Sequence, residues 1–228
     1  MKYLLAFIIC FKIFEMGAQE SYDATGLSFN LNSSININSK YSLKPAVKGR
    51  YVSLINKTDG LERIEEKSQR IDLQMALEKR LKSTTKIAVG ALHRFSDAQN
   101  ATRFFEQLGW VKNTNSNITF IHRINSDQTF RGIDDIEIRL RYRFGISLPL
   151  EGYNLNSNEK YFLAYTEILG KHRNPDFTNE VRLKLVIGKL MKGGSKAELG
   201  IDIRYDNPFD GIRERLYLLD LAYYFNLN

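Results

Sequence analysis

The feature that most constrains the fold is a strict alternation of apolar and polar side chains in residues 136–148. The apolar set takes every second position and consists of Ile136, Ile138, Leu140, Tyr142, Phe144, Ile146 and Leu148. The positions between them hold Glu137, Arg139, Arg141, Arg143, Gly145 and Ser147. Successive side chains of a strand point to opposite faces, whereas a helix would mix the two sets around its circumference. The segment is therefore predicted to be a long strand with one apolar and one charged face.

The same alternation recurs beyond Thr25, which predicts an all-β protein. It is clear at 70–78, 181–187, 198–205 and 217–225, and weaker at 25–38, 41–55, 84–95, 102–112, 116–128 and 159–170. With 136–148 these make eleven candidate strands. An up-and-down antiparallel barrel with both termini on one side of a membrane needs an even number. We therefore expect about ten to twelve strands and favour twelve, so that either 21–38 contains two strands or one weak segment is not a strand.

The N-terminal segment has the pattern of a secretion signal. Lys2 precedes an apolar run at residues 3–11, and the small residue Ala18 follows a few positions later. This is the arrangement of a cleavable signal peptide, and the run is too short for a spanning helix. We expect residues 1–18 to be a signal peptide and residues 19–228 to form one barrel domain.

The chain has a single cysteine, Cys10, which lies within the predicted signal peptide. The mature chain would then contain no cysteine, which is compatible with an oxidising periplasm and excludes a disulfide framework. A lipid anchor on Cys10 is a weaker alternative, because Ile9 stands where a small residue is normally needed.

A transmembrane barrel explains the pattern better than a soluble one. Alternation alone also fits a soluble lipocalin-like barrel, whose apolar face points inward. The predicted strands, however, reach the roughly ten residues that cross a bilayer at a tilt, and no later segment approaches a transmembrane helix. Aromatic residues gather near strand ends, as an interfacial girdle requires: Tyr41, Tyr51, Phe95, Trp110, Phe130, Tyr161, Phe162 and Tyr205.

The C-terminal segment resembles the assembly signal of outer-membrane barrels. Asp220 is followed by Ala222, and then by Phe225 and Leu227 on the lipid-facing parity. We therefore expect the protein in the outer membrane, with outer-membrane lipid, lipopolysaccharide and the barrel-assembly machinery as partners. The net charge is +7, but it is dispersed and no nucleic-acid-binding motif accompanies it, so nucleic acid is not expected as a partner.

Several short blocks resemble a family of small Gram-negative outer-membrane β-barrel proteins of unknown function. The main block is Glu137 to Gly145 followed by Ser147 to Leu150, and Tyr161 to Glu167 is similar to a second. Phe105-Glu106-Gln107 and His122-Arg123 resemble further blocks. The resemblance implies a barrel over most of the mature chain and supplies no catalytic residues.

The polar face of the strands is the most informative candidate site. On the clear strands and the last one, the inward charged positions hold nine cations and seven carboxylates. The lumen-lining charges are predicted to include Glu137, Arg139, Arg141, Arg143, Arg182, Lys184, Glu198, Asp202 and Arg204. Because an uncompensated buried ion is costly, nearly balanced charges should pair across a narrow lumen. This favours a structural or assembly component of the outer membrane, or a narrow small-solute channel.

An enzyme that modifies outer-leaflet lipid, as a hydrolase or an acyltransferase, is the alternative function. His93 and Ser96 lie near the inferred extracellular end of one strand, where a base could activate a hydroxyl. No acidic partner is identifiable, so we expect no catalytic residues and assign neither residue to catalysis. Three scattered histidines make no metal-ligand cluster, and we expect neither a metal nor a cofactor.

Overall fold

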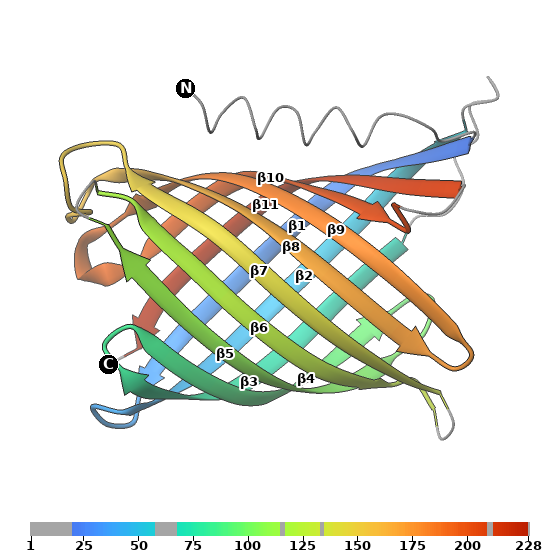
Figure 1. Cartoon of the computed structure of the whole chain (residues 1–228), viewed down its shortest axis with the longest axis horizontal. Helices are drawn as coiled ribbons and strands as arrows, with labels where there is room; N and C mark the ends of the chain where they lie inside the picture. Colours follow the sequence, from blue (N-terminus) through green and yellow to red (C-terminus); the bar gives the residue numbers. More distant parts are fainter. Residues whose placement is uncertain (1–19, 58–67, 115–116, 133–134, 209–211, 228) are drawn as a thin grey trace.

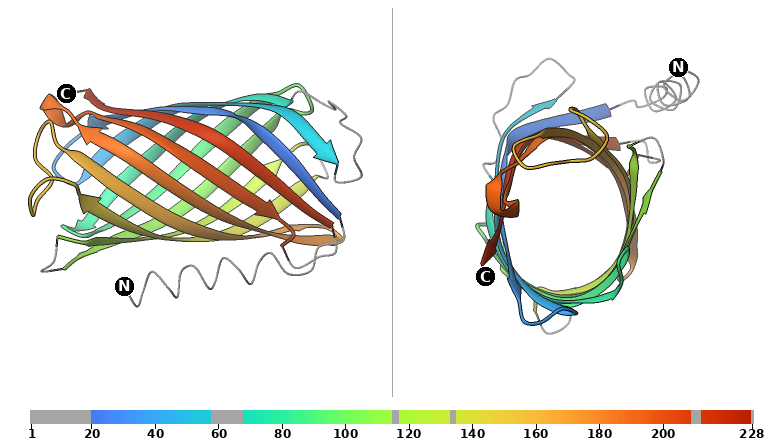
Figure 2. Two further views of the ribbon diagram at one scale, coloured as in Figure 1. Left: turned by 90° about the horizontal axis from the view of Figure 1, so that it is seen from above. Right: turned by 90° about the vertical axis from the view of Figure 1, so that its left-hand side faces the viewer.

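The computed structural model describes residues 20–57, 68–114, 117–132, 135–208 and 212–227. These residues form a closed barrel of eleven strands (Figure 1). The strands are β1 (Glu20–Asn36), β2 (Tyr41–Lys57), β3 (Ser68–Lys82), β4 (Thr85–Ser96), β5 (Ala101–Asn113), β6 (Thr119–Phe130), β7 (Ile136–Pro149), β8 (Lys160–Arg173), β9 (Asp176–Leu190), β10 (Lys196–Asp206) and β11 (Ile212–Leu227). Each strand pairs with the next in the chain, and Figure 2 shows the closed ring along its axis. The predicted all-β, up-and-down barrel is confirmed.

The number of strands is eleven rather than the favoured twelve. Residues 21–38, which could have held two strands, fall mainly in the single strand β1. The ring closes because β1 pairs parallel with β11, from Glu20 opposite Ile212 to Ile35 opposite Leu227. A parallel ladder satisfies the backbone groups of both edge strands, so closure does not require an even count. The first and last strands therefore run in the same direction, and the described chain begins and finishes at opposite ends of the barrel (Figure 1).

The gaps between the alternating segments of the sequence predict a short turn at Gly193-Gly194 and longer loops near 56–68 and 170–178, and the structure agrees with this only in part. The turn at Gly193-Gly194 is present, and both glycines have positive φ values of 77° and 79°, which glycine adopts without strain. It belongs to a single 3₁₀ turn, η1 (Lys192–Gly194). The long loop expected near 170–178 is absent, because β8 and β9 are joined by residues 174–175 alone. The predicted signal peptide, and most of the loop predicted near 56–68, lie outside the described residues.

The two faces of the wall differ as the alternation predicts. On β7 the side chains of Ile138 and Leu140 point outward and are 51% and 62% exposed, whereas Glu137 and Arg139 point inward and are buried. Similar outward apolar rows follow β1, β3, β10 and β11. No described helix is long and apolar enough to cross a membrane.

Candidate functional site

The barrel interior contains two adjoining cavities of about 250 and 350 Å³. We term the first the arginine chamber, because Arg50, Arg70, Arg94 and Arg204 line it near the end where β1 begins. The second, the mixed chamber, lies toward the end where β11 finishes and is lined by both polar and apolar side chains. Nine residues line both cavities, and we term them the belt: Asn30, Lys48, Gln74, Phe105, Gln107, Arg123, Arg143, Tyr165 and Lys184.

The structure places the predicted lumen charges on the inner face of the wall. Those that line the arginine chamber are Arg139, Arg141, Arg143, Arg182, Lys184, Asp202 and Arg204. Glu198 lines the mixed chamber, where its carboxylate accepts a hydrogen bond of 2.5 Å from the Tyr161 hydroxyl. Glu137 is buried and accepts a hydrogen bond from Arg131. Arg80, which the alternation also placed inside, is exposed at the end of β3, where the register with β4 shifts.

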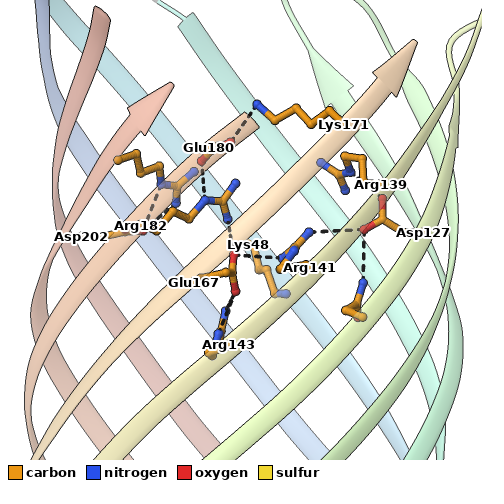
Figure 3. A network of polar contacts seen from close by, with 12 residues as sticks. Lys48, Asp127, Arg139, Arg141, Arg143, Glu167, Lys171, Glu180, Arg182 and Asp202 are labelled. Carbon is orange, nitrogen blue, oxygen red and sulfur yellow. Dashed lines mark hydrogen bonds and ion pairs between the residues drawn. The ribbon is translucent and has the colours of Figure 1, made fainter. Parts of the chain in front are cut away.

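Glu167 on β8 is the centre of the largest ion-pair network in the described lumen (Figure 3). Its side chain is fully buried, and it lies 2.8 Å from Arg143, 3.1 Å from Arg182 and 3.5 Å from Arg141. In the register of β7 and β8, Glu167 is directly opposite Arg143. One carboxylate therefore neutralises part of the charge of three arginines.

Two further carboxylates extend this network along the same side of the barrel (Figure 3). Asp127 on β6 lies 2.6 Å from Arg139 and 3.3 Å from each of Arg103 and Arg141. Glu180 on β9 pairs with Arg182 and with Lys171, the latter at 2.8 Å. Glu167, Asp127 and Glu180 are each shared by at least two cations, so the cations of this network outnumber its carboxylates.

The expected balance of charges does not hold for the arginine chamber. Among the described residues, twelve cations and five carboxylates line it. The carboxylates are Asp72, Asp127, Glu167, Asp202 and Asp220. The cations missed from the sequence are Lys48, Arg50, Arg94, Arg103 and Arg123. They lie on β2, β4, β5 and β6, whose alternation of apolar and polar residues is weak. Only a count of the charged residues at the inward-facing positions of these strands would have found them.

The charged residues of the belt are all cationic: Lys48, Arg123, Arg143 and Lys184. Arg143 pairs with Glu167 and Lys184 with Asp220. Lys48 donates a 2.8 Å hydrogen bond to the neutral Gln74, and Arg123 has no hydrogen-bond or ion-pair partner among the described residues. The charged side chains that line both cavities are thus all of one sign.

Asp220, predicted as part of the C-terminal assembly signal, lies at the seam that closes the barrel. Its carboxylate accepts hydrogen bonds from Ser28 and Asn30 of β1 and from Lys184 of β9. These contacts tie together β1, β9 and β11.

The other three residues of that signal also lie on β11. Ala222 is buried, Phe225 stacks on Tyr223 with ring centroids 5.9 Å apart, and Leu227 is exposed. Ala222 therefore faces inward, and Phe225 and Leu227 face outward, as expected from the sequence.

The structure does not bring His93 and Ser96 together. His93 is on the exposed face of β4, and its Nδ1 lies 2.9 Å from the Thr102 hydroxyl. The hydroxyl of Ser96 bonds instead to Asp97, and the spacing of three residues puts the two side chains on opposite faces of the strand. Within the described ranges, no three His, Cys, Asp or Glu side chains are grouped so that they could hold a metal ion.

The ends of the barrel carry carboxylates that accept hydrogen bonds from the backbone. Asp97 accepts one of 2.9 Å from the Gln69 amide, which lowers the pKa of that carboxyl. At the opposite end, the backbone and side-chain amides of Asn156 donate to Glu159 and lower its pKa. These contacts order the two loops, and neither loop adds a charge to the lumen.

Comparison with known proteins yields one family. A family model described as "Protein of unknown function (DUF2490)" matches residues 25–215. The match includes the blocks at 137–150 and 161–167, in agreement with the resemblance to a barrel family of unknown function. No match was found among curated proteins or among solved structures.

Proposed function

The chain belongs to the DUF2490 family of unknown function, and we propose that it is an outer-membrane β-barrel that forms a narrow, anion-selective channel for small solutes. The main support for the proposal is the excess of cations over carboxylates around the two adjoining lumen cavities. A ring of Lys and Arg side chains is the arrangement that favours anions in pores.

The outer surface supports a membrane location. Its exposed apolar side chains follow several strands, and soluble monomers rarely expose apolar patches larger than a few hundred Å². The aromatic rings of Trp110 and His122 stack with centroids 4.9 Å apart, and Phe144 lies 5.2 Å from His122. Such a cluster on outward positions suits the interface of a bilayer. A soluble lipocalin-like barrel would have the opposite arrangement, with an apolar interior.

Lipid, lipopolysaccharide and the barrel-assembly machinery are the partners that this location implies. Outward side chains such as Leu219 and Leu221 would face lipid, and the β11 segment that ends in Phe225 and Leu227 would be recognised during assembly. Phe225→Asp places a charge at an outward-facing position of β11, so we expect it to prevent stable assembly. Phe225→Leu, which keeps the parity apolar, serves as the matched control.

Cell fractionation and heat-modifiable gel mobility test the location. The unmodified protein is expected in the outer-membrane fraction, in a folded form whose mobility changes on boiling. Recovery as a soluble periplasmic protein would contradict the proposal.

Planar-bilayer recording of the purified protein tests the channel. We expect small, stepwise conductances, because the network around Glu167 occupies part of the lumen. A complete absence of current would contradict the channel and leave a structural or assembly role. Hydrolysis or acyl transfer of lipid by the same preparation, lost in His93→Ala, would instead indicate the enzyme alternative.

A further inference from the structure

We propose that the belt is a binding site for small phosphate monoesters, with the phosphate between Lys48 and Arg123 and the organic part in the mixed chamber. The inference deepens the proposed channel function and rests on the same lumen. Its basis is two cations, Lys48 and Arg123, that lie on two sides of the barrel and form no ion pair with a carboxylate among the described residues.

The surroundings of Arg123 favour the binding of an additional anion. In the register of β6 and β7 it is directly opposite Arg143, and like charges in this relation are destabilising. Arg143 is stabilised by Glu167 and by the Tyr165 ring, whose centroid lies 4.3 Å from its guanidinium carbon. Among the described residues, Arg123 forms no ion pair with Glu167, which pairs with three other arginines and attracts Arg123 only from a longer distance.

Lys48 reaches the belt from a distant part of the ring. Three strands separate β2 from β6, yet both Lys48 and Arg123 line both cavities. The carboxylate opposite Lys48 in the register is Asp72, but Arg94 binds both of its oxygens, at 2.7 and 2.8 Å. Within the described part of the chain, the ammonium group of Lys48 therefore has only the neutral Gln74 as a hydrogen-bond partner.

The charged side chains around Lys48 favour the binding of a doubly charged oxyanion. Arg123, Arg141 and Arg143 are the cations whose repulsion acts on Lys48. The arginine chamber also contains buried guanidinium nitrogens without hydrogen-bond partners, namely Arg50 Nε, Arg139 Nη2 and Arg141 Nε. A phosphate monoester carries close to two negative charges at neutral pH and has three acceptor oxygens. It supplies the charge and the acceptors that this part of the wall lacks.

The mixed chamber explains why the ligand should have an organic part. Beyond the belt its wall includes the apolar side chains of Ala88, Ile121 and Leu163, and Phe105 of the belt adjoins them. The cavity of about 350 Å³ is within the range of small-molecule sites, which combine apolar walls with a few polar groups. An ester whose body is small and apolar would occupy this wall while its phosphate meets the belt.

Isothermal titration calorimetry of the full-length mature protein in an uncharged detergent tests the site, with phenyl phosphate as the probe. We expect phenyl phosphate to bind more tightly than inorganic phosphate, and phenol not to bind measurably. Lys48→Gln and Arg123→Gln should each weaken phenyl phosphate binding by about tenfold or more. Lys48→Arg, which keeps the charge, should bind nearly as well as the unmodified protein.

The matched controls remove the same charges outside the lumen. Lys82 and Arg80 are exposed near the end of β3, so Lys82→Gln and Arg80→Gln should leave the affinity unchanged. Heat-modifiable mobility confirms that each variant is folded before titration.

Three results would overturn the inference: no binding by the unmodified protein, equal affinity for inorganic phosphate, or binding that neither belt variant weakens. Because the titration needs no membrane, its failure is separate from failure of the channel. Anion-selective current without phenyl phosphate binding would overturn this site alone. Binding without any current would support the site and contradict the channel.

Discussion

Two parts of the lumen wall differ in whether carboxylates neutralise their cations. Along β6 to β9, Asp127, Glu167 and Glu180 each bind two or three cations at short range. On β2, by contrast, Lys48 and Arg50 have no carboxylate partner among the described residues. The same residue types therefore have two environments within one barrel.

The difference indicates that the two parts of the wall have different roles, one in stability and one in selecting solutes. A buried ion pair that loses one partner leaves an uncompensated charge, so the paired wall should be sensitive to loss of its carboxylates. Lys48 and Arg50 have no such partner to lose among the described residues, and their positive potential remains available to a solute. We infer that the paired wall shapes the lumen, whereas Lys48, together with the exceptional Arg123 of β6, determines what enters it.

The largest expected effect is that of Glu167→Gln. The change leaves Arg141, Arg143 and Arg182 without their shared carboxylate, so the free energy of unfolding should fall by about 3 kcal/mol. Guanidinium titration of the detergent-solubilised barrel, followed by gel mobility, measures this. Glu151→Gln, at an exposed loop position, is the control and should change it by less than about 0.5 kcal/mol. Equal stability of the two variants would contradict the structural role of the paired wall.

A smaller loss is expected for Asp220→Asn. Ser28 and Asn30 can still bond to an amide oxygen, but Lys184 loses its charged partner. We expect a decrease of about 2 kcal/mol in the free energy of unfolding, measured in the same titration. The newly unpaired Lys184 should also increase anion selectivity, so an unchanged selectivity would show that its charge does not act on the lumen.

The smallest effect on stability is expected for Lys48→Gln. Glutamine can still donate a hydrogen bond to Gln74, and the change removes repulsion from Arg123, Arg141 and Arg143. The free energy of unfolding should therefore stay within about 0.5 kcal/mol of the unmodified value or rise slightly. A loss as large as that of Glu167→Gln would mean that the two walls do not differ.

The alternation predicts which face each side chain of β7 occupies, because the period of a strand is independent of its neighbours. It cannot predict which ions pair, since that depends on register. Glu167 meets Arg143 only because β7 and β8 align them. The weaker strands concealed the cation excess: Arg123 follows His122, so no clean polar-apolar alternation marks its face. The observed eleven strands lie within the predicted ten to twelve; only the preference for an even number was wrong, because it did not allow for the parallel closure between β1 and β11.

The most direct test of the proposed channel is the reversal potential of the unmodified protein in a planar bilayer with a KCl gradient. We expect a reversal potential with the sign that corresponds to chloride permeation, and a shift toward zero in the double variant Lys48→Gln with Arg123→Gln. A reversal potential of zero or of the potassium sign in the unmodified protein would contradict it, because the unneutralised cations of the belt would then have no influence on what passes through the barrel.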